Sequence, residues 1–427
     1  MLRMFPREAS VEAGGMLRLY VATRARRYML GIERWGGGGV PVLEAGPFRG
    51  EDAPPGAVDA PWDWPTIDIA VPRNLRPGAY VVRALIEGSV PVKGPRDGTP
   101  DARWGTALFV VRAPSRARVL VNLPLFTYHA YNVAHVDGTL GAGEGECLYS
   151  GPNTVTLLRP GGGTGGHPWD ELHDDVYDPA SPRQTFAHWD LHALDQLARE
   201  GIDVDVCTDV DLHREGTMLG RYALLCTFGH DEYWTREKRM HVEQFVDGGG
   251  AVAFFGGNTC WYRVRYDETH RTIARDGKWS DDEPEDTLTG LSFRCGGGKW
   301  VGARPPTGYR IEGASHPLLR AAGLRDGDVI GEKSTVVGYE CDGIDPARAP
   351  SSLAVLGRAP IGHWDVADGS GEVAPESHAA MVAFRRGEGT VFNAGSADWA
   401  RALAENDRGV TAITRAVLRA SVGRPGH

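Results

Sequence analysis

Residues Tyr222–Val264 read YALLCTFGHDEYWTREKRMHVEQFVDGGGAVAFFGGNTCWYRV, and the rest of the chain is organised around them. The apolar run 223–228 has the length and composition of a buried parallel strand. Thr235 is placed to cap a helix that ends at the glycine run 248–250. A second apolar run, 251–255, follows directly. The stretch therefore predicts a strand–helix–strand unit of an α/β sheet.

Polar side chains follow both strands of this unit. His230, Asp231 and Glu232 come after the first strand, and Asn258 comes after the second. In open α/β sheets, ligands bind at the carboxyl ends of the strands, because the loops there converge on a crevice. The acidic residues could instead only support the start of the following helix. Three consecutive ionisable residues exceed what a cap needs, so His230 and Glu232 are the leading site candidates.

Length and composition limit the class of protein. The 427 residues exceed one ordinary core and predict two domains, 1–115 and 116–427. A content of 41% hydrophobic and 24% charged residues is typical of a globular protein in water. The net charge of −10, with no basic block, argues against a nucleic-acid partner. Neither a signal peptide nor a membrane-spanning apolar run is evident, so we expect a cytoplasmic protein with no membrane contact.

The part of the chain before residue 115 is rich in short alternating runs. Segments 17–21, 28–33, 78–87 and 107–111 each fit a strand, and glycine and proline clusters separate them. This pattern predicts an antiparallel β-sandwich. Trp62 and Trp64 could stack on a sugar, but paired tryptophans this close are more often core or domain-interface residues.

The part after residue 116 alternates strands with helices. Strand-like runs at 118–124 and 202–208 precede the opening stretch, and a helix with Phe186, Leu191, Leu194 and Leu197 lies between them. Alternation of this kind predicts a mainly parallel α/β sheet with helices on both faces. Its order resembles the flavodoxin or glutamine-amidotransferase type.

A long insertion separates the first strand of this domain from its first helix. It contains Tyr128, Tyr131, Tyr149 and the glycine run 161–163. Insertions this long inside a compact domain are usually functional. The glycine run lacks the Lys-Ser/Thr of a phosphate-binding loop, so we interpret it as a flexible lid.

Several of these motifs together carry a resemblance to a known family. The chain resembles the large subunit of N,N-dimethylformamidase and its relatives over about residues 116 to 421, and more weakly in the front sandwich. The motifs that match are Tyr131-Asn132, Tyr149, the FGHDEYW turn at 228–234, Gly257-Asn258 and Phe392-Asn393-Ala394-Gly395-Ser396.

The resemblance implies an enzyme that hydrolyses a small amide with the help of a mononuclear ferric iron. The implied ligands are Tyr131, Tyr149 and Glu232, with Tyr128 as an alternative, and the implied residues around them are His230, Asn258 and Glu376. Phenolate and carboxylate ligands suit a hard trivalent ion, whereas zinc sites usually contain His or Cys. Asn258 would donate a hydrogen bond to the developing oxyanion, and His230 or Glu376 would carry protons. The resemblance also suggests a small partner subunit, or a homo-oligomer.

Competing interpretations remain open at this level. His188 and His192 have a spacing that could place two imidazoles on one helical face for zinc, near His167, His173 and Asp174. The metalloprotease motif is missing, however, because no glutamate follows His188. A carbohydrate-active enzyme could pair Asp231 with Glu232, although adjacent residues rarely face each other across a substrate.

A third class is a binding or scaffold protein that keeps an amidotransferase-like fold without catalysis. Its expected turn would carry no nucleophilic cysteine, and Cys226 lies within the strand rather than at its turn. We expect all six cysteines to be structural: Cys147, Cys207, Cys226, Cys260, Cys295 and Cys341. The segment 262–310, with Trp279, Trp300 and Tyr309, is expected to line the substrate pocket.

Overall fold

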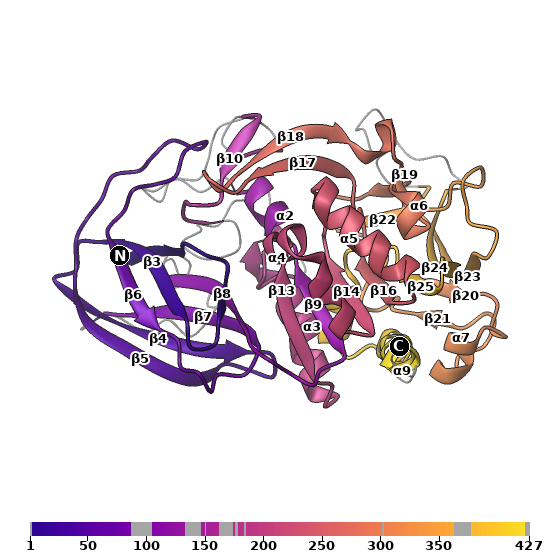
Figure 1. Ribbon diagram of the computed structural model, residues 1–427. Coiled ribbons are helices and arrows are strands. Elements are labelled where there is room, and N and C mark those ends of the chain that lie inside the picture. The colour runs from indigo at the N-terminus through magenta and orange to yellow at the C-terminus, as the bar shows by residue number, and fades with distance from the viewer. Residues whose placement is uncertain are drawn as a thin grey trace. The chain divides into compact units, whose positions relative to one another are not determined.

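The computed structural model describes residues 2–86, 105–132, 147–149, 151–161, 174–175, 178–182, 185–300, 303–362 and 377–422 (Figure 1). Its contacts divide the chain into two compact units. The first comprises Met1–Arg116, Leu125–Asp211 and Val264–Asp276, and the second Ala117–Pro124, Leu212–Arg263 and Gly277–His427. The chain passes between the units several times, while the division into 1–115 and 116–427 stays a prediction.

The first unit opens with two sheets that share one apolar core. One has the order β1-β3-β6 and the other β2-β8-β7-β4-β5. Their pairings are antiparallel except for β2 with β8, which is parallel. The strands are β1 (Leu2–Pro6), β2 (Ser10–Glu12), β3 (Met16–Thr23), β4 (Arg27–Trp35), β5 (Val40–Arg49), β6 (Thr66–Ala70), β7 (Gly78–Leu85) and β8 (Thr106–Arg112).

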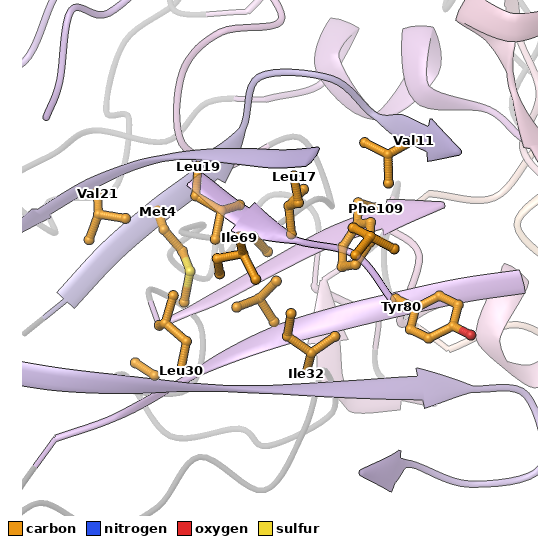
Figure 2. Packing of buried hydrophobic residues seen from close by; sticks show 14 of the residues in the cluster. Met4, Val11, Leu17, Leu19, Val21, Leu30, Ile32, Ile69, Tyr80 and Phe109 are labelled. Carbon is orange, nitrogen blue, oxygen red and sulfur yellow. The ribbon is translucent and has the colours of Figure 1, made fainter. Parts of the chain in front are cut away.

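Alternation along these strands explains the sandwich. Leu17, Leu19 and Val21 of β3 point to the same side, because successive side chains of a strand alternate between faces. They pack in one cluster with Leu30 and Ile32 of β4, from the other sheet. Figure 2 shows these side chains between the two layers of strands. Among the described strands the two sheets pack as the predicted sandwich, and β2–β8 departs from it as a parallel pair.

Trp62 and Trp64 form a smaller core cluster in the first unit. Their rings lie 5.5 Å apart and pack with Phe5 and Leu158. Both tryptophans are buried, and each indole N–H donates to a backbone carbonyl, of Ala57 and Pro54 respectively. They are therefore core residues, as their close spacing favoured, and their faces are not exposed to a sugar.

The remaining elements of the first unit are short. They are α2 (Leu125–Ala130), β10 (Thr154–Thr156), β11 (Asp174–Asp175), β12 (Asp178–Pro182), α3 (Asp190–Arg199) and β13 (Val204–Thr208). Three others cross the boundary between the units: α4 (Asp209–Arg214), β17 (Tyr262–Asp267) and β18 (Thr272–Lys278).

The second unit is built on a sheet whose strands follow the order β9-β14-β16-β25-β24-β23-β20-β21. The first four are parallel: β9 (Val119–Leu123), β14 (Leu224–Gly229), β16 (Ala251–Gly256) and β25 (Gly389–Asn393). The next four pair antiparallel: β24 (His378–Arg386), β23 (Ala354–Pro360), β20 (Tyr309–Ile311) and β21 (Val329–Ile330). The prediction of a mainly parallel sheet is thus corrected to a mixed sheet.

Helices complete the second unit. They are α5 (Arg236–Asp247), α6 (Asp286–Thr289), α7 (Pro317–Ala322), α8 (Trp399–Ala404) and α9 (Arg408–Val422), with 3-10 turns η2 (Gly216–Arg221) and η3 (Trp279–Asp281). Phe255 of β16 packs toward Trp399 of α8, whereas its neighbour Phe254 packs toward Trp234. Adjacent residues of a strand face opposite sides, so both faces of the sheet are covered at this point.

Two further pairs of strands lie next to this sheet in the second unit's part of the chain. β19 (Ser292–Gly298) pairs antiparallel with β22 (Glu340–Gly343), and β15 (Tyr233–Trp234) pairs with the start of β17. Cys341 of β22 forms a bridge to Ser396, just after β25. In the parts of the chain that the structure describes, no helix is long and apolar enough to cross a membrane.

Candidate active site

The site is organised by two glycines at the carboxyl ends of β14 and β16. Gly229 and Gly256 are paired in register, and Gly229 has a φ of 64°, a region that favours glycine. A Cβ on Gly256 would lie 2.5 Å from the Gly229 carbonyl oxygen. The next residue, Gly257, donates its N–H to that same oxygen at 3.1 Å. The two strand ends therefore approach each other more closely than side chains would allow.

Backbone hydrogen bonds then tie together the loops that leave these strands. Cys260 N–H donates to the Asp231 carbonyl at 2.9 Å, and Tyr262 N–H donates to the Glu232 carbonyl at 3.0 Å. Asn258 sits between them with a φ of 51°, in the left-handed region that asparagine tolerates better than most residues. The polar residues after β14 and β16 are thus held on one continuous piece of backbone.

Four buried polar side chains meet at this place. The amide nitrogen Nδ2 of Asn258 lies 2.9 Å from Glu232 Oε1 and 3.2 Å from Glu340 Oε2. His230 Nε2 lies 2.6 Å from Glu340 Oε2 and 3.6 Å from Glu232 Oε2. All four side chains are at most 5% exposed. The structure therefore brings together His230, Glu232 and Asn258, as expected from neighbouring strand ends.

Glu340 is the member of this cluster that sequence reasoning missed. It lies on β22, and the indole N–H of Trp300 donates to its Oε1 at 2.9 Å. Asp342, two residues further along β22, accepts a hydrogen bond from the backbone N–H of Asn258 at 2.8 Å. Both acidic residues lie in the short, fully buried strand Glu340–Gly343, whose burial is not evident from its sequence.

The electrostatics of the cluster follow from its burial. Burial alone would lower the pKa of His230, but the carboxylates of Glu340 and Glu232 outweigh it and raise that pKa to about 9. Burial raises the pKa of Asp342 to about 7, although the Asn258 backbone N–H favours its ionised form. The imidazole is therefore held as a cation between two carboxylates.

The orientation of Asn258 limits what it can do. Its Nδ2 is directed at the carboxylates of Glu232 and Glu340, whereas its Oδ1 has no hydrogen-bond partner within the described part of the chain. Buried amide oxygens are rarely left in that state without a reason. This oxygen is therefore an acceptor available to a molecule that enters the site.

Asp231 has a structural role beside the site. Its carboxylate pairs with the buried Lys238 Nζ at 2.8 and 2.9 Å, and that ammonium lies 3.9 Å from the ring centre of Trp234. Asn122 of β9 donates to the same carboxylate at 3.3 Å. Asp231 is therefore the acidic residue that supports the start of α5. Asp231 and Glu232 have different partners, so they do not face each other across a substrate.

The tyrosines suggested as ligands belong to the first unit. The rings of Tyr131 and Tyr149 are stacked with their centres 5.0 Å apart and their planes at 28°. Tyr149 N–H donates to the Ala130 carbonyl at the end of α2, and its own carbonyl accepts from Arg275 at 3.1 Å. Tyr128 instead donates its hydroxyl to the buried Asp190. The pairing with Glu232, which lies in the second unit, stays a prediction.

The remaining candidates belong to the first unit, to the second unit, or to the part of the chain outside the described residues. Glu376, His167 and His173 lie outside them. His188 precedes the start of α3 at Asp190 and packs edge-on against Trp189, with ring centres 4.3 Å apart, while His192 lies within that helix. Of the expected pocket residues, Trp300 donates to Glu340 of the cluster. Trp279 and Tyr309 are fully buried, and Tyr309 interacts electrostatically with Asp342 of β22.

The cysteines of the chain are poorly suited to catalysis. All six cysteines are free thiols, and burial raises the pKa of Cys226, Cys260 and Cys341 well above the usual range and that of Cys295 to about 12. Such thiols are poor nucleophiles. Among the described residues, no group of three or more His, Cys, Asp or Glu side chains could hold a metal ion.

Comparison with known families adds to this geometry. The family model described as "N,N-dimethylformamidase beta subunit-like, C-terminal" matches residues 34–411, which covers most of the chain. The chain belongs to this family. The match includes the turn after β14, the end of β16 and the β22 strand, so the buried cluster lies within the family's shared region.

Individual relatives match over shorter stretches. The N,N-dimethylformamidase beta subunit of Paracoccus aminophilus is 34% identical over 76 residues, which is 18% of this chain and 10% of that protein. The corresponding subunit of Alcaligenes sp is 33% identical over 76 residues, with the same coverage. The match thus spans about a tenth of the curated relatives' length. A solved exo-beta-1,4-mannosidase, Op5Man5 from Opitutaceae bacterium strain TAV5, aligns over 73% of this chain and 36% of its own at 11% identity, with a TM-score of 0.33.

Proposed function

We propose that the chain hydrolyses the C–N bond of a small amide. The observation that carries this proposal is the buried cluster of His230, Glu232, Asn258 and Glu340, in a chain of the dimethylformamidase family. Two carboxylates, one imidazolium and one unpartnered amide acceptor are a costly set to bury. Such sets are found where a polar substrate is bound and protons are moved.

The proposed cofactor is one ferric ion held by Tyr131, Tyr149 and Glu232. The Glu232 carboxylate, 3.6 Å from His230 Nε2 in the cluster, is a hard oxygen donor of the kind that a ferric ion prefers. The stacked phenols of Tyr131 and Tyr149 add two hard oxygen donors. Bound there, a ferric ion would supply Lewis acidity toward the amide carbonyl.

The side chains around that position have separate tasks. His230, kept protonated by Glu340 and Glu232, can give a proton to the departing nitrogen of the amide. Asn258 Oδ1 can accept a hydrogen bond from a substrate N–H or from water. Donation to an oxyanion, as the sequence suggested, would require the Asn258 amide to turn away from the two carboxylates. Trp300 holds Glu340 in place through its indole N–H.

We also propose that the parallel part of the sheet has an amidotransferase-like fold. The parallel strands β9, β14, β16 and β25 support an amidotransferase-like half of the sheet, with the polar turn after β14 in place of a cysteine. The relatives are named as beta subunits, which supports a partner subunit or an oligomer. We propose a cytoplasmic setting on the sequence grounds given above.

The test compares Glu232→Gln with a matched control, Glu237→Gln. Glu237 is an exposed residue of α5 whose surface pair with His213 contributes little to stability. The purified protein should contain iron, show a visible phenolate-to-iron absorption band and hydrolyse N,N-dimethylformamide or formamide. Glu232→Gln should lose the band, the iron and the turnover, while Glu237→Gln keeps all three.

Two results would contradict the proposal in different ways. An active protein without iron or colour would rule out the iron cofactor but would still support an amide hydrolase. An iron-free protein that hydrolyses neither amide would favour the binding or scaffold class instead.

A further inference from the structure

A cavity of about 320 Å³ lies in the second unit, away from the cluster of His230 and Glu232. Its lining residues come from β16, β24 and β25 and from the ends of α7 and α9. These two helices pack against each other (Figure 1). Ala251 at the start of β16 lines it, whereas Asn258 follows the other end of that strand. Its size is at the lower end of the range of small-molecule sites, about 300–1,000 Å³.

The inner surface of this cavity is mainly apolar, with Ser352, Thr390 and Ser421 as the hydroxyl side chains among its lining residues. Val252, Phe384, Phe392, Val417 and Leu318 are among the lining side chains, and the first four are buried. Filling such a surface with a hydrocarbon group removes it from water, which is favourable in proportion to the apolar area covered. The cavity therefore suits an alkyl or aryl group rather than a sugar or a nucleotide.

The charges at the cavity have one sign. The lining residues, all of which the structure describes, include no Asp or Glu, but they include Arg385 at the end of β24. Within the described part of the chain, the Arg385 guanidinium has no ion-pair partner, whereas its neighbour Arg386 pairs with Asp247 at 3.0 Å. In a chain with a net charge of −10, an exposed arginine next to an apolar cavity is a local anion-binding feature.

His316 adds a neutral hydrogen-bond donor to the same lining. Burial and the nearby Arg320 lower its pKa, so the ring is neutral at pH 7. Its Nδ1 accepts the backbone N–H of Leu318 at 3.3 Å, which places the ring proton on Nε2. A guanidinium and an imidazole N–H are both suited to a carboxylate.

We propose that this cavity binds a small apolar monocarboxylate, with its hydrocarbon part between β16, β25 and α9 and its carboxylate at Arg385. The proposal is independent of the amide hydrolase, because none of the lining residues belongs to the cluster of His230, Glu232, Asn258 and Glu340.

The test is a calorimetric titration of the full chain with octanoate, and with octan-1-ol as the uncharged counterpart. The unaltered chain should bind one octanoate saturably. Arg385→Gln should weaken octanoate about tenfold or more and change octan-1-ol little, because only the charge-assisted contact is lost. The matched control Arg325→Gln removes an exposed cation outside the lining and should leave both affinities unchanged.

A second variant tests the position of the hydrocarbon. Ala420 is an exposed residue of α9 that lines the cavity, so Ala420→Phe should leave the fold intact and weaken both probes. Circular dichroism checks the fold. The proposal is overturned if the chain shows no saturable octanoate binding, if Arg385→Gln and Arg325→Gln have equal effects, or if Ala420→Phe changes nothing. It is also overturned if the cavity variants change self-association and not binding, which would make this face an interface between copies.

Discussion

Asn258 connects the two carboxylates of the candidate site, because its amide nitrogen lies within 3.2 Å of both Glu232 and Glu340. If the Asn258 amide turns to donate a hydrogen bond to the developing oxyanion, we expect Asn258→Ala to keep the metal and to lower kcat by about 10²–10³. Iron content and steady-state rates measured on the same preparation check this. An unchanged kcat would remove Asn258 from the mechanism.

Asp342 should give the folded chain a measurable pH dependence. Its pKa is raised by burial from 3.8 to about 7. Between these two pH values the folded chain keeps a proton on Asp342 that the unfolded chain releases. Its contribution to stability is complete below about pH 4 and is lost as pH rises through 7. Asp342→Asn keeps an acceptor for Asn258 N–H and should flatten the stability profile between pH 4 and 8, with a gain at pH 8.

Urea unfolding at several pH values measures that profile. The negative charges of Glu340 and Glu285 also raise the pKa of Asp342. At 1.36 kcal/mol per pKa unit, the gain in unfolding free energy at pH 8 should amount to a few kcal/mol at most. Parallel profiles for the two proteins would show that Asp342 is not the group responsible.

The thiols give a prediction of the opposite kind. Cys226 lies inside β14 and Cys260 is held by the Asp231 carbonyl, and burial keeps both thiols protonated. Cys226→Ala and Cys260→Ala should therefore retain turnover, with at most a modest loss of stability. A loss of activity in a normally folded Cys260→Ala protein would point to thiol catalysis.

Sequence patterns identified part of this site for a physical reason. His230, Glu232 and Asn258 come directly after apolar runs, and strand ends are readable from the run itself. Glu340 lies far along the chain, on a strand whose pairing with β19 depends on tertiary contacts. Nothing in the local sequence Tyr339–Gly343 indicates that Glu340 will lie beside His230. This closest carboxylate partner of His230 was therefore not predictable.

At the scale of elements, α5 has the start and end that its sequence predicts. The Thr235 side chain accepts from Lys238 N–H at 3.2 Å, and the helix ends before Gly248. Its buried stripe is less predictable, because Lys238 is fully buried against Asp231 while Met240 is 45% exposed. A buried ion pair reverses the preference expected from residue type alone.

That ion pair should be costly to break on one side. Lys238→Met leaves the Asp231 carboxylate buried without its main partner, and we expect a loss of about 3–5 kcal/mol in the free energy of unfolding. The double variant Lys238→Met with Asp231→Asn should recover much of that loss, since neither charge is then stranded. Denaturant titrations of the three variants would show it, and additive effects would mean that the two groups are not coupled.

The antiparallel half of the sheet shows where pattern reading fails. Positions 379–384 of β24 are all buried, and such a continuous apolar run is the same in a parallel and an antiparallel strand. The deciding signal is the short connection at Gly387-Glu388 between β24 and β25. Parallel neighbours need a long crossover, so a connection this short permits only a hairpin.

At the scale of the whole molecule, the course of the chain bears on how it can be divided. Within the first unit, Trp62 N–H donates to the Leu158 carbonyl and Thr156 N–H to the Val58 carbonyl, both at 2.9 Å. A fragment of residues 116–427 would lose these partners and expose Leu158. We expect it to unfold at a lower temperature than the full chain and to bind a dye for exposed apolar surface.

Circular dichroism melting curves and dye fluorescence of the two proteins provide the comparison. If the fragment melts cooperatively at the temperature of the full chain, the boundary near residue 116 is that of an independent domain. The two-domain division predicted from length would then hold.

The contact between Gly229 and Gly256 also bears on how this protein can diversify. Gly256 cannot acquire a side chain without separating β14 from β16, since a Cβ there would lie 2.5 Å from the Gly229 oxygen, and the φ of 64° at Gly229 is strained for other residues. The loops that carry His230, Glu232 and Asn258 are therefore fixed to each other by backbone contacts, with little room for change at the strand ends. If the chain hydrolyses amides as proposed, we expect its substrate range to be easier to change at the aromatic residues Trp261, Phe293 and Trp300, whose rings form a chain of edge-on contacts. Libraries aimed at new amides should vary those three positions and leave the glycines fixed.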